Sequence, residues 1–329
     1  EPSFSGAHGN YAVILTKLNR RSEAHAAFEL AVTAPDVDAD CLLNFAMMLE
    51  EEKQEARAYD FYRHAFELED SSAVVCECLA KQAMRLNKNA EVAELFADLT
   101  LRHPSFPFAW FYLGQALLAE SRVEAARRAM GQYLSLDPDD KLGSQLVLGA
   151  GGAIPLPEGP GEAYLKNFYR IRADHWDETV VQAYNGHDII MGAFDMCLSG
   201  GHIAARVLDA GCGTGLAGVE FKSHASSLIG VDLSPEMLKL AEKRKIYDEL
   251  LQEELAACMQ ARAGALDLIV AADVFCYIGD LADTLAAARV ALRSSGRLIF
   301  SVEAQSKRGF SLTGSGRYAH KPAYIRKAA

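Results

Sequence analysis

Hydrophobic and polar positions in the first 140 residues repeat with a period of 34 residues. Small residues occupy one position of each repeat and follow a large apolar residue, giving the pairs Tyr11-Ala12, Phe45-Ala46, Leu79-Ala80 and Leu113-Gly114. Two further lines keep the same register, one of large side chains at Phe28, Tyr62, Phe96 and Met130, and one of smaller side chains at Ala24, Ala58, Val92 and Ala126. This pattern predicts four helix pairs, whose small residues let the helices approach closely while the larger ones fill the gap to the next pair. Four stacked repeats are enough for an independent solenoid.

From residue 205 onward, apolar runs alternate with amphipathic ones. The apolar runs, at residues 206–210, 227–232, around 250, 266–273 and 296–303, predict strands. Helices are expected between them, one opened by Ser234 as N-cap with Pro235 in its first turn, and a later one over residues 280–295. Strands that are apolar throughout and separated by helices indicate a parallel sheet covered on both faces. We therefore expect a doubly wound α/β domain with a ligand at the carboxyl ends of its strands.

A segment rich in glycine and proline separates the two patterns, over residues 149–161. Such a segment cannot continue a helix and is typical of a linker. A short amphipathic stretch just before it, residues 141–148, is expected to cap the last repeat. The predicted organisation is an all-α solenoid at 1–148, a linker at 149–161 and an α/β domain at 162–329.

Composition and charge narrow the classes of partner. With 44 acidic and 33 basic side chains the formal net charge is −11, which repels nucleic acid and anionic lipid surfaces, so neither partner is expected. The seven cysteines show no metal-binding spacing, so we expect reduced thiols and no metal site. No long apolar run or leader pattern is visible, and we expect a cytoplasmic protein; because the first residue is Glu1, a removed leader stays open.

The stretch VLDAGCGTG at residues 207–215 predicts the ligand. One frame of the following loop satisfies G-x-G-x-x-G and is compatible with a dinucleotide, but Asp209 stands where it would repel a pyrophosphate. A carboxylate there suits a ligand with positive charge, while glycines at 211, 213 and 215 let the backbone approach that ligand. Asp232, at the end of the next strand, is placed to accept hydrogen bonds from ribose hydroxyls. The two acids fit S-adenosylmethionine better than an anionic dinucleotide.

Three segments, VLDAGCGTG, GVDLSPEML and DLIVAADVFCYIGDL, together resemble class I S-adenosylmethionine-dependent methyltransferases, which have a Rossmann-like fold. The last repeat, with Trp110, Leu113, Gly114, Leu117, Ala126 and Pro138, resembles the tetratricopeptide repeat, and the whole order resembles bacterial tetratricopeptide-methyltransferase fusion proteins. The resemblance implies that S-adenosylmethionine is the cofactor and that its site comprises Asp209, Gly211, Gly213, Gly215, Asp232, Leu233, Met237, Glu254, Leu255 and Ala272. Within that set, Leu233 and Met237 would pack on adenine, and Glu254-Leu255 would lie at its amino group.

Aromatic residues are the candidates for the acceptor side. Tyr169 and Trp176 lie on an expected helix that is either a lid over the cofactor or a linker helix joining the repeats to the sheet. Phe275 and Tyr277, after the fourth strand, either wall the acceptor pocket or pack in the core. No proline follows that strand, unlike in enzymes that methylate DNA bases, which again disfavours a DNA substrate.

His320 is the candidate general base, with Tyr318 beside it in SGRYAHKPAY; the alternative is a structural histidine. A complete class I domain has seven strands, and few residues follow the fifth here, so either the last two strands lie beyond Ala329 or the fifth strand is left open. An open strand edge is a pairing liability, so we expect another segment or another chain to shield the fifth strand.

These features predict methyl transfer to an acceptor that is either a small metabolite or a protein side chain. The solenoid is expected to bind a protein partner on its concave face, or else to serve only as a packing module, for instance in a homo-oligomer. The alternative from another class is a non-catalytic scaffold whose second domain is a degenerate nucleoside-binding fold. Against it, both Asp209 and Asp232 are retained.

Overall fold

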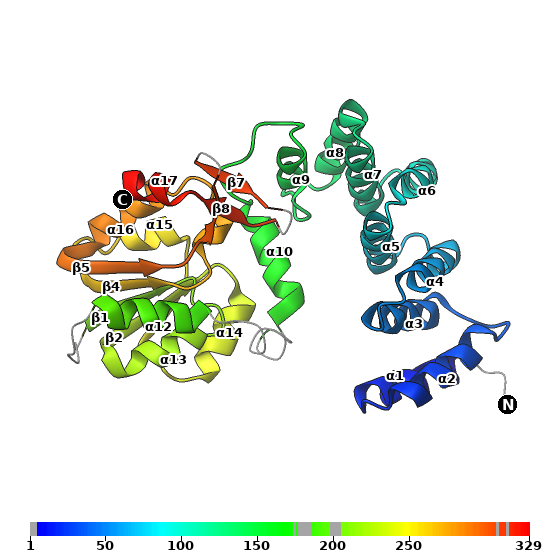
Figure 1. Cartoon of the computed structure of the whole chain (residues 1–329), viewed down its shortest axis with the longest axis horizontal. Helices are drawn as coiled ribbons and strands as arrows, with labels where there is room; N and C mark the ends of the chain where they lie inside the picture. Colours follow the sequence, from blue (N-terminus) through cyan, green and yellow to red (C-terminus); the bar gives the residue numbers. More distant parts are fainter. Residues whose placement is uncertain (1–4, 174–175, 177–185, 198–204, 307–308, 314–315) are drawn as a thin grey trace. The chain divides into compact units, whose positions relative to one another are not determined.

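The computed structural model describes residues 5–173, 176, 186–197, 205–306, 309–313 and 316–329. The chain forms two compact units, Glu1–Pro138 and Asp139–Ala329 (Figure 1). The boundary therefore precedes the predicted cap and linker, and the short helix α9 (Ser144–Ala150) belongs to the second unit. There the residue before α9, Gly143, lies so close to Tyr164 that a Cβ would stand 2.8 Å from the ring. The carbonyl of Lys141 also accepts a hydrogen bond from Asn167 at 3.2 Å.

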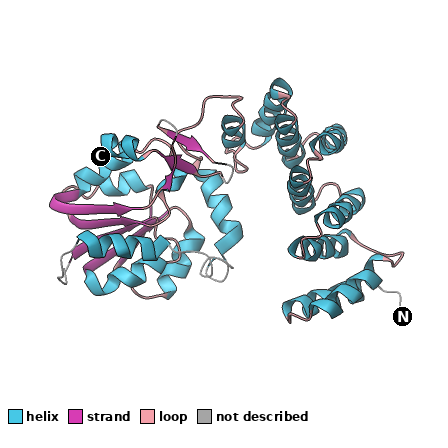
Figure 2. Cartoon of the chain, in the orientation of Figure 1, coloured by secondary structure: helices cyan, strands magenta, loops and turns pink. Residues whose placement is uncertain are grey.

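The first unit consists of helix pairs in the predicted register (Figure 2). The pairs are α1 (Ser5–Lys17) with α2 (Arg21–Val32), α3 (Ala39–Glu51) with α4 (Glu55–Leu68), α5 (Ala73–Arg85) with α6 (Asn89–Arg102), and α7 (Pro107–Ala119) with α8 (Val123–Leu136). Both the first and the second helices of successive pairs begin 34 residues apart, which confirms the repeat.

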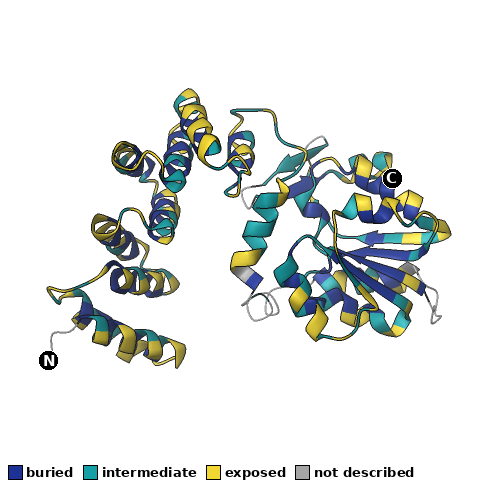
Figure 3. Ribbon diagram, turned by 180° about the vertical axis from the view of Figure 1, so that it is seen from behind, coloured by how far each residue is buried: buried dark blue, intermediate teal, exposed yellow. Residues whose placement is uncertain are grey.

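The lines of side chains predicted to be buried form the core of this unit (Figure 3). Phe28, Tyr62, Phe96 and Met130 are all enclosed. Gly114 packs so tightly on the last of these that a Cβ would lie 2.8 Å from the Cγ atom of Met130. In the first pair the large apolar position differs, because Tyr11 is half exposed.

The second unit is built on a five-stranded parallel sheet of order β3-β2-β1-β4-β5. The strands are β1 (Ala205–Ala210), β2 (Ala225–Asp232), β3 (Glu249–Gln252), β4 (Leu266–Ala271) and β5 (Leu292–Phe300). Helices α12 (Gly186–Cys197) and α13 (Leu216–Phe221) cover one face, and α15 (Leu255–Gln260), α16 (Ala282–Ala291) and α17 (Pro322–Ala328) cover the other (Figure 1). Neighbouring residues such as Val207 and Leu208 enter opposite cores, which explains why the strands are apolar throughout.

Two further helices lie near the carboxyl ends of the strands, namely α10 (Glu162–Arg172) and α14 (Pro235–Lys243). Ser234 caps α14 as expected, since its Oγ accepts a hydrogen bond from the Met237 amide at 3.2 Å. The helix predicted over 280–295 ends earlier, at Ala291, because the following residues enter β5 and Leu292 pairs with Leu266. Of the predicted lid segment, residues 174–175 and 177–181 lie outside the described residues.

The segment after β5 forms a small second sheet of order β6-β8-β7, from β6 (Glu303–Ala304), β7 (Phe310–Leu312) and β8 (Tyr318–His320). Among the described residues, β5 has β4 as its one strand neighbour. Tyr324 and Ile325 of α17 pack on the same core as Leu298 and Phe300 of β5, so α17 covers a face of this strand. Cover of its edge by another chain stays a prediction. No helix within the described ranges is long and apolar enough to cross a membrane.

Candidate functional site

A cavity of about 370 Å³ lies at the carboxyl ends of β1, β2 and β4, where a doubly wound sheet is expected to bind its ligand. Its volume falls in the range of about 300–1,000 Å³ that is usual for small-molecule sites. The wall includes most of the predicted cofactor residues, namely Asp209, Gly211, Gly213, Asp232, Leu233, Met237, Glu254, Leu255 and Ala272, and the predicted acceptor residues Tyr169, Trp176 and Tyr277.

The glycine loop between β1 and α13 requires left-handed backbone, with φ of 72° at Gly211 and 52° at Gly213. A Cβ at Gly211 would stand 2.4 Å from Cγ2 of Val274, so this position admits only glycine. A Cβ at Gly213 would meet no protein atom within 4 Å, because it would point into the open cavity. The loop backbone at Gly213 is therefore accessible to a ligand.

Gly215 serves a different purpose from the one predicted. It is the N-cap of α13, with φ of 90°, and it is not part of the cavity wall. A Cβ there would lie 3.1 Å from both Arg244 and Tyr247, behind the loop. This glycine keeps the loop close to the residues beneath it.

Asp209 is the last but one residue of β1 and is buried, with 1% of its surface exposed. Its Oδ2 accepts a hydrogen bond of 2.6 Å from the hydroxyl of Tyr247. Burial raises the pKa of Asp209 to about 6, the Tyr247 hydrogen bond works against that rise, and the negative charge of Asp232 adds to it. Sequence reasoning missed Tyr247, since it lies in the loop before β3 and has no motif around it.

Asp232 ends β2 and fastens the glycine loop to the next helix. Its Oδ2 accepts from the Gly213 amide at 2.9 Å, and its Oδ1 accepts from the Ser234 amide at 2.8 Å. Burial still raises the pKa of Asp232, although these backbone donors oppose the change. Each oxygen retains a second lone pair for a ligand hydroxyl.

Glu254 is held by the helix that follows it. Its carboxylate caps α15, accepting from the amides of Ala256 at 3.0 Å and Ala257 at 2.8 Å. Capping fixes the orientation of this side chain at the cavity wall. The neighbouring Glu253 also lines the cavity and was not anticipated.

Three aromatic rings line another part of the cavity. Tyr169 belongs to α10, and its ring centroid lies 5.4 Å from that of Trp176 and 6.0 Å from that of Tyr277. Burial, together with a hydrogen bond to Tyr277, raises the pKa of Tyr169 well above its usual value. Helix α10 thus contributes to the cavity wall, and whether it acts as a lid stays a prediction.

Phe275 is not a wall residue. The short 3₁₀ turn Phe275–Tyr277 directs Phe275 into the core, where its ring lies 4.8 Å from that of Phe300, and leaves Tyr277 at the cavity. The expectation that both rings wall the pocket is therefore corrected to Tyr277 alone.

Tyr318 and His320 lie outside the cavity wall as well, because both point into the packing around β8. Tyr318 donates its hydroxyl to the Pro157 carbonyl at 2.7 Å. His320 is fully buried, with Nε2 2.9 Å from the Gly279 carbonyl and its ring stacked on Tyr324. The structure thus gives these residues structural contacts and does not bring His320 to the place where an acceptor would bind.

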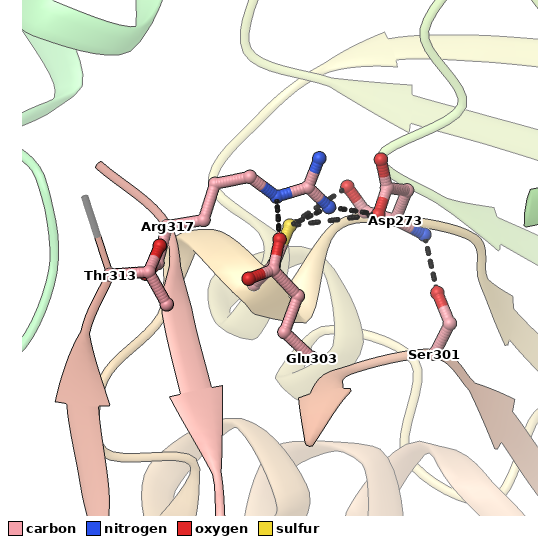
Figure 4. Close-up of polar contacts among 6 residues, drawn as sticks. Asp273, Ser301, Glu303, Thr313 and Arg317 are labelled. Atoms are coloured by element: carbon pink, nitrogen blue, oxygen red, sulfur yellow. Dashed lines mark hydrogen bonds and ion pairs between the residues drawn. The ribbon is translucent and has the colours of Figure 1, made fainter. Parts of the chain in front are cut away.

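Asp273 is a wall residue that the sequence did not single out. It follows β4 with φ of 62°, and its amide donates to the hydroxyl of Ser301 at 2.8 Å. Figure 4 shows its carboxylate paired with Arg317, whose Nε lies 2.7 Å from Glu303. Arg317, just before β8, thus connects the small sheet to the cavity wall through its ion pair with Asp273. Glu303 of β6 pairs with the same guanidinium.

All the charged side chains in the described part of the cavity wall are carboxylates. The ionisable carboxylates of its wall are Asp209, Asp232, Glu253, Glu254, Asp273 and Glu162, and no Lys, Arg or His belongs to the wall among the described residues. No three His, Cys, Asp or Glu side chains gather as a metal site in that part of the chain. The cavity therefore favours cationic or neutral ligands over anionic ones.

Known methyltransferases are similar to part of the second unit. Residues 208–300 match a family model described as "Methyltransferase domain". Over 147 residues the chain is 28% identical to a ubiquinone biosynthesis O-methyltransferase of Aromatoleum aromaticum, covering 42% of this chain and 61% of that relative. The chain thus spans less than two thirds of this relative's length.

Solved structures resemble each half. A SAM-dependent methyltransferase of Leishmania major is 17% identical, with a TM-score of 0.40, over 49% of this chain and 71% of that one. YrrB, described as a TPR protein with an unusual peptide-binding site, is 16% identical, with a TM-score of 0.35, over 44% of this chain and 75% of that one.

Proposed function

We propose that this chain transfers a methyl group from S-adenosylmethionine to an acceptor held beside the three aromatic rings, because residues 208–300 match the methyltransferase family model. One observation carries the proposal. The cavity combines an accessible glycine loop with two buried or half-buried carboxylates, Asp209 and Asp232, and has no cationic side chain in its described wall. An anionic dinucleotide would meet only repulsion there.

The residues present suit S-adenosylmethionine part by part. Asp209 and the backbone at Gly213 would hold the methionine end, where the ammonium group is attracted by the carboxylate. The free lone pairs of Asp232 suit the ribose hydroxyls, and the apolar surfaces of Leu233 and Met237 suit adenine. Glu254 can accept a hydrogen bond from the adenine amino group only through the lone pairs that its two capping hydrogen bonds leave free.

S-adenosylmethionine supplies a methyl group on a sulfonium that is already a strong electrophile, so the protein must mainly orient the acceptor and exclude water. Tyr169 and Trp176 contribute to exclusion by closing the cavity with apolar ring surface. General-base catalysis by His320 does not enter this proposal, because the ring is enclosed in the small sheet.

The helical repeats are proposed to bind a protein partner that brings the acceptor or places the enzyme near it. Large apolar side chains remain exposed on this unit, among them Tyr11, Ile14, Leu18, Leu30, Met47, Met84 and Leu101. Stacked helical repeats form extended surfaces that bind other proteins, and a bound partner would cover side chains of this kind. A second copy of this chain would satisfy the same requirement, which sedimentation at several concentrations would show.

Calorimetric titration of S-adenosylhomocysteine into the full chain tests the cofactor assignment. We expect micromolar binding that Asp232→Ala weakens at least tenfold, because the variant loses the ribose contact and the anchor of the loop. Asp283→Ala, an exposed acid of α16, is the matched control and leaves binding unchanged. No binding to the unmodified chain would favour the non-catalytic scaffold and reject the proposal.

A further inference from the structure

The aromatic and acidic composition of the cavity wall indicates what kind of acceptor fits. We propose that the acceptor is an amine, which enters the cavity as an alkylammonium ion beside the rings of Tyr169, Trp176 and Tyr277. This inference rests on the proposed methyltransferase function and identifies the chemical class of its second substrate.

The rings are arranged at steep angles to one another. The Tyr169 plane is tilted 63° from that of Trp176 and 73° from that of Tyr277, so the three rings do not stack as a flat layer. The rings pack edge to face on one another, and the faces of Trp and Tyr rings attract an ammonium ion. All three belong to the wall of the same cavity.

The carboxylates of the cavity wall also favour a cationic acceptor. Glu162 and Asp273 belong to the same cavity wall as the rings, and the cations that pair with them, Lys166 and Arg317, do not belong to its described part. Glu162 pairs at 2.6 Å with Lys166, one turn along α10, and that lysine is not a wall residue. A carboxylate or phosphate acceptor would therefore find no counter-ion in this part of the cavity.

The guanidinium next to the Tyr277 part of the wall is already paired with carboxylates. Arg317 stands 5.6 Å from the Tyr277 ring centroid and is paired with Asp273 and Glu303 (Figure 4). Two carboxylates around one guanidinium leave a net negative cluster, so Arg317 does not make an anion site.

The chemistry of transfer separates an amine from an acidic acceptor. An alkylammonium first loses one proton to solvent; the nitrogen lone pair then forms the new N–C bond while the C–S bond breaks and its electron pair stays on sulfur. Positive charge moves from sulfur to nitrogen, so carboxylates in the wall stabilise it throughout. A phenolate or carboxylate acceptor would instead place a negative charge beside these carboxylates, and the wall would repel it before transfer.

The test measures binding to the full chain saturated with S-adenosylhomocysteine, whose own titration is completed first. The probes are phenethylamine, 2-phenylethanol and phenylacetate, which share one ring and differ in charge. We expect phenethylamine to bind at least tenfold more tightly than 2-phenylethanol, with no detectable binding of phenylacetate.

Two variants assign the preference to this wall. Asp273→Asn is expected to weaken phenethylamine at least fivefold and to leave 2-phenylethanol unchanged, since Asn keeps the size of the side chain and removes the charge. Asp283→Asn removes an equal charge outside the cavity and should change neither. Equal binding of all probes, a preference for phenylacetate, or no phenethylamine binding to a chain that binds S-adenosylhomocysteine would overturn the amine assignment. Failure of S-adenosylhomocysteine itself to bind would instead overturn the proposed function.

Discussion

The hydrogen bond between Tyr247 and Asp209 controls the charge of the predicted methionine site. Asp209 has a pKa of about 6 against an ordinary value of 3.8, chiefly because it is buried. The folded chain therefore holds this proton more tightly than the unfolded chain, and ionisation costs about 3 kcal/mol of folding free energy as pH rises from about 4 to 6. The 2.6 Å bond from the Tyr247 hydroxyl limits that cost.

Replacing Tyr247 by Phe removes the hydroxyl and keeps the ring. A hydrogen bond to a charged group contributes about 1.5–3 kcal/mol, so its loss should raise the pKa of Asp209 from about 6 to roughly 7–8. The ionised fraction at pH 7 would fall from about nine tenths to between one half and one tenth. Affinity for the ammonium of S-adenosylhomocysteine should then drop about twofold to tenfold at pH 7 and recover by about pH 8.5.

Titration calorimetry with S-adenosylhomocysteine from pH 5.5 to 8.5 measures this shift directly. Tyr324→Phe is the matched control, because it removes a hydroxyl that donates to Asp280 at 2.6 Å on the protein surface. The control should follow the unmodified chain at every pH. A loss of affinity in Tyr247→Phe that is equal at all pH values would refute the electrostatic argument and indicate a purely structural role.

Three further predictions test the placement of individual side chains. Phe275→Ala should lower the free energy of unfolding by about 3–5 kcal/mol and Tyr277→Ala by less than half as much, since only the first ring is fully buried; equal losses in urea denaturation would contradict this. Asp38→Ala should cost about 1 kcal/mol by the same measurement, because Asp38 accepts from the Cys41 amide at 2.8 Å as the N-cap of α3, and Asp38→Asn should restore most of it. Gly218→Ala places a Cβ 2.2 Å from the Tyr247 hydroxyl and should cost about 1–3 kcal/mol and weaken S-adenosylhomocysteine binding, which unchanged thermal denaturation would disprove.

The local sequence pattern was sufficient to predict the helical repeats and the part of the candidate site near the glycine loop. The 34-residue spacing of small and large side chains predicted four helix pairs and their common register, because packing of one helix pair on the next imposes the same requirement in every repeat. The turn within each pair was not visible. Asn19, Lys53, Asn87 and Ser121 occupy one register and all adopt left-handed backbone, although their side chains have little in common.

Residues near the glycine loop were also predictable, since Asp209 and Asp232 lie at the carboxyl ends of adjacent parallel strands and the loop after β1 must turn sharply. Their partners were not predictable. Tyr247 reaches Asp209 from 38 residues away, and Arg317 reaches Asp273 from 44 residues away, so neither contact leaves a local signal.

The remaining differences concern which way a side chain points. Phe275 and Tyr277 are two residues apart in one turn, yet one packs in the core and the other lines the cavity. His320 has the chemistry of a base and lies enclosed in the small sheet. By itself the sequence determined the repeat period, the parallel sheet and the acids at the carboxyl ends of β1 and β2, because these depend on the order of residues along the chain. Only the tertiary structure decided which side chains share the cavity, because that depends on how distant segments pack against the carboxyl ends of the strands.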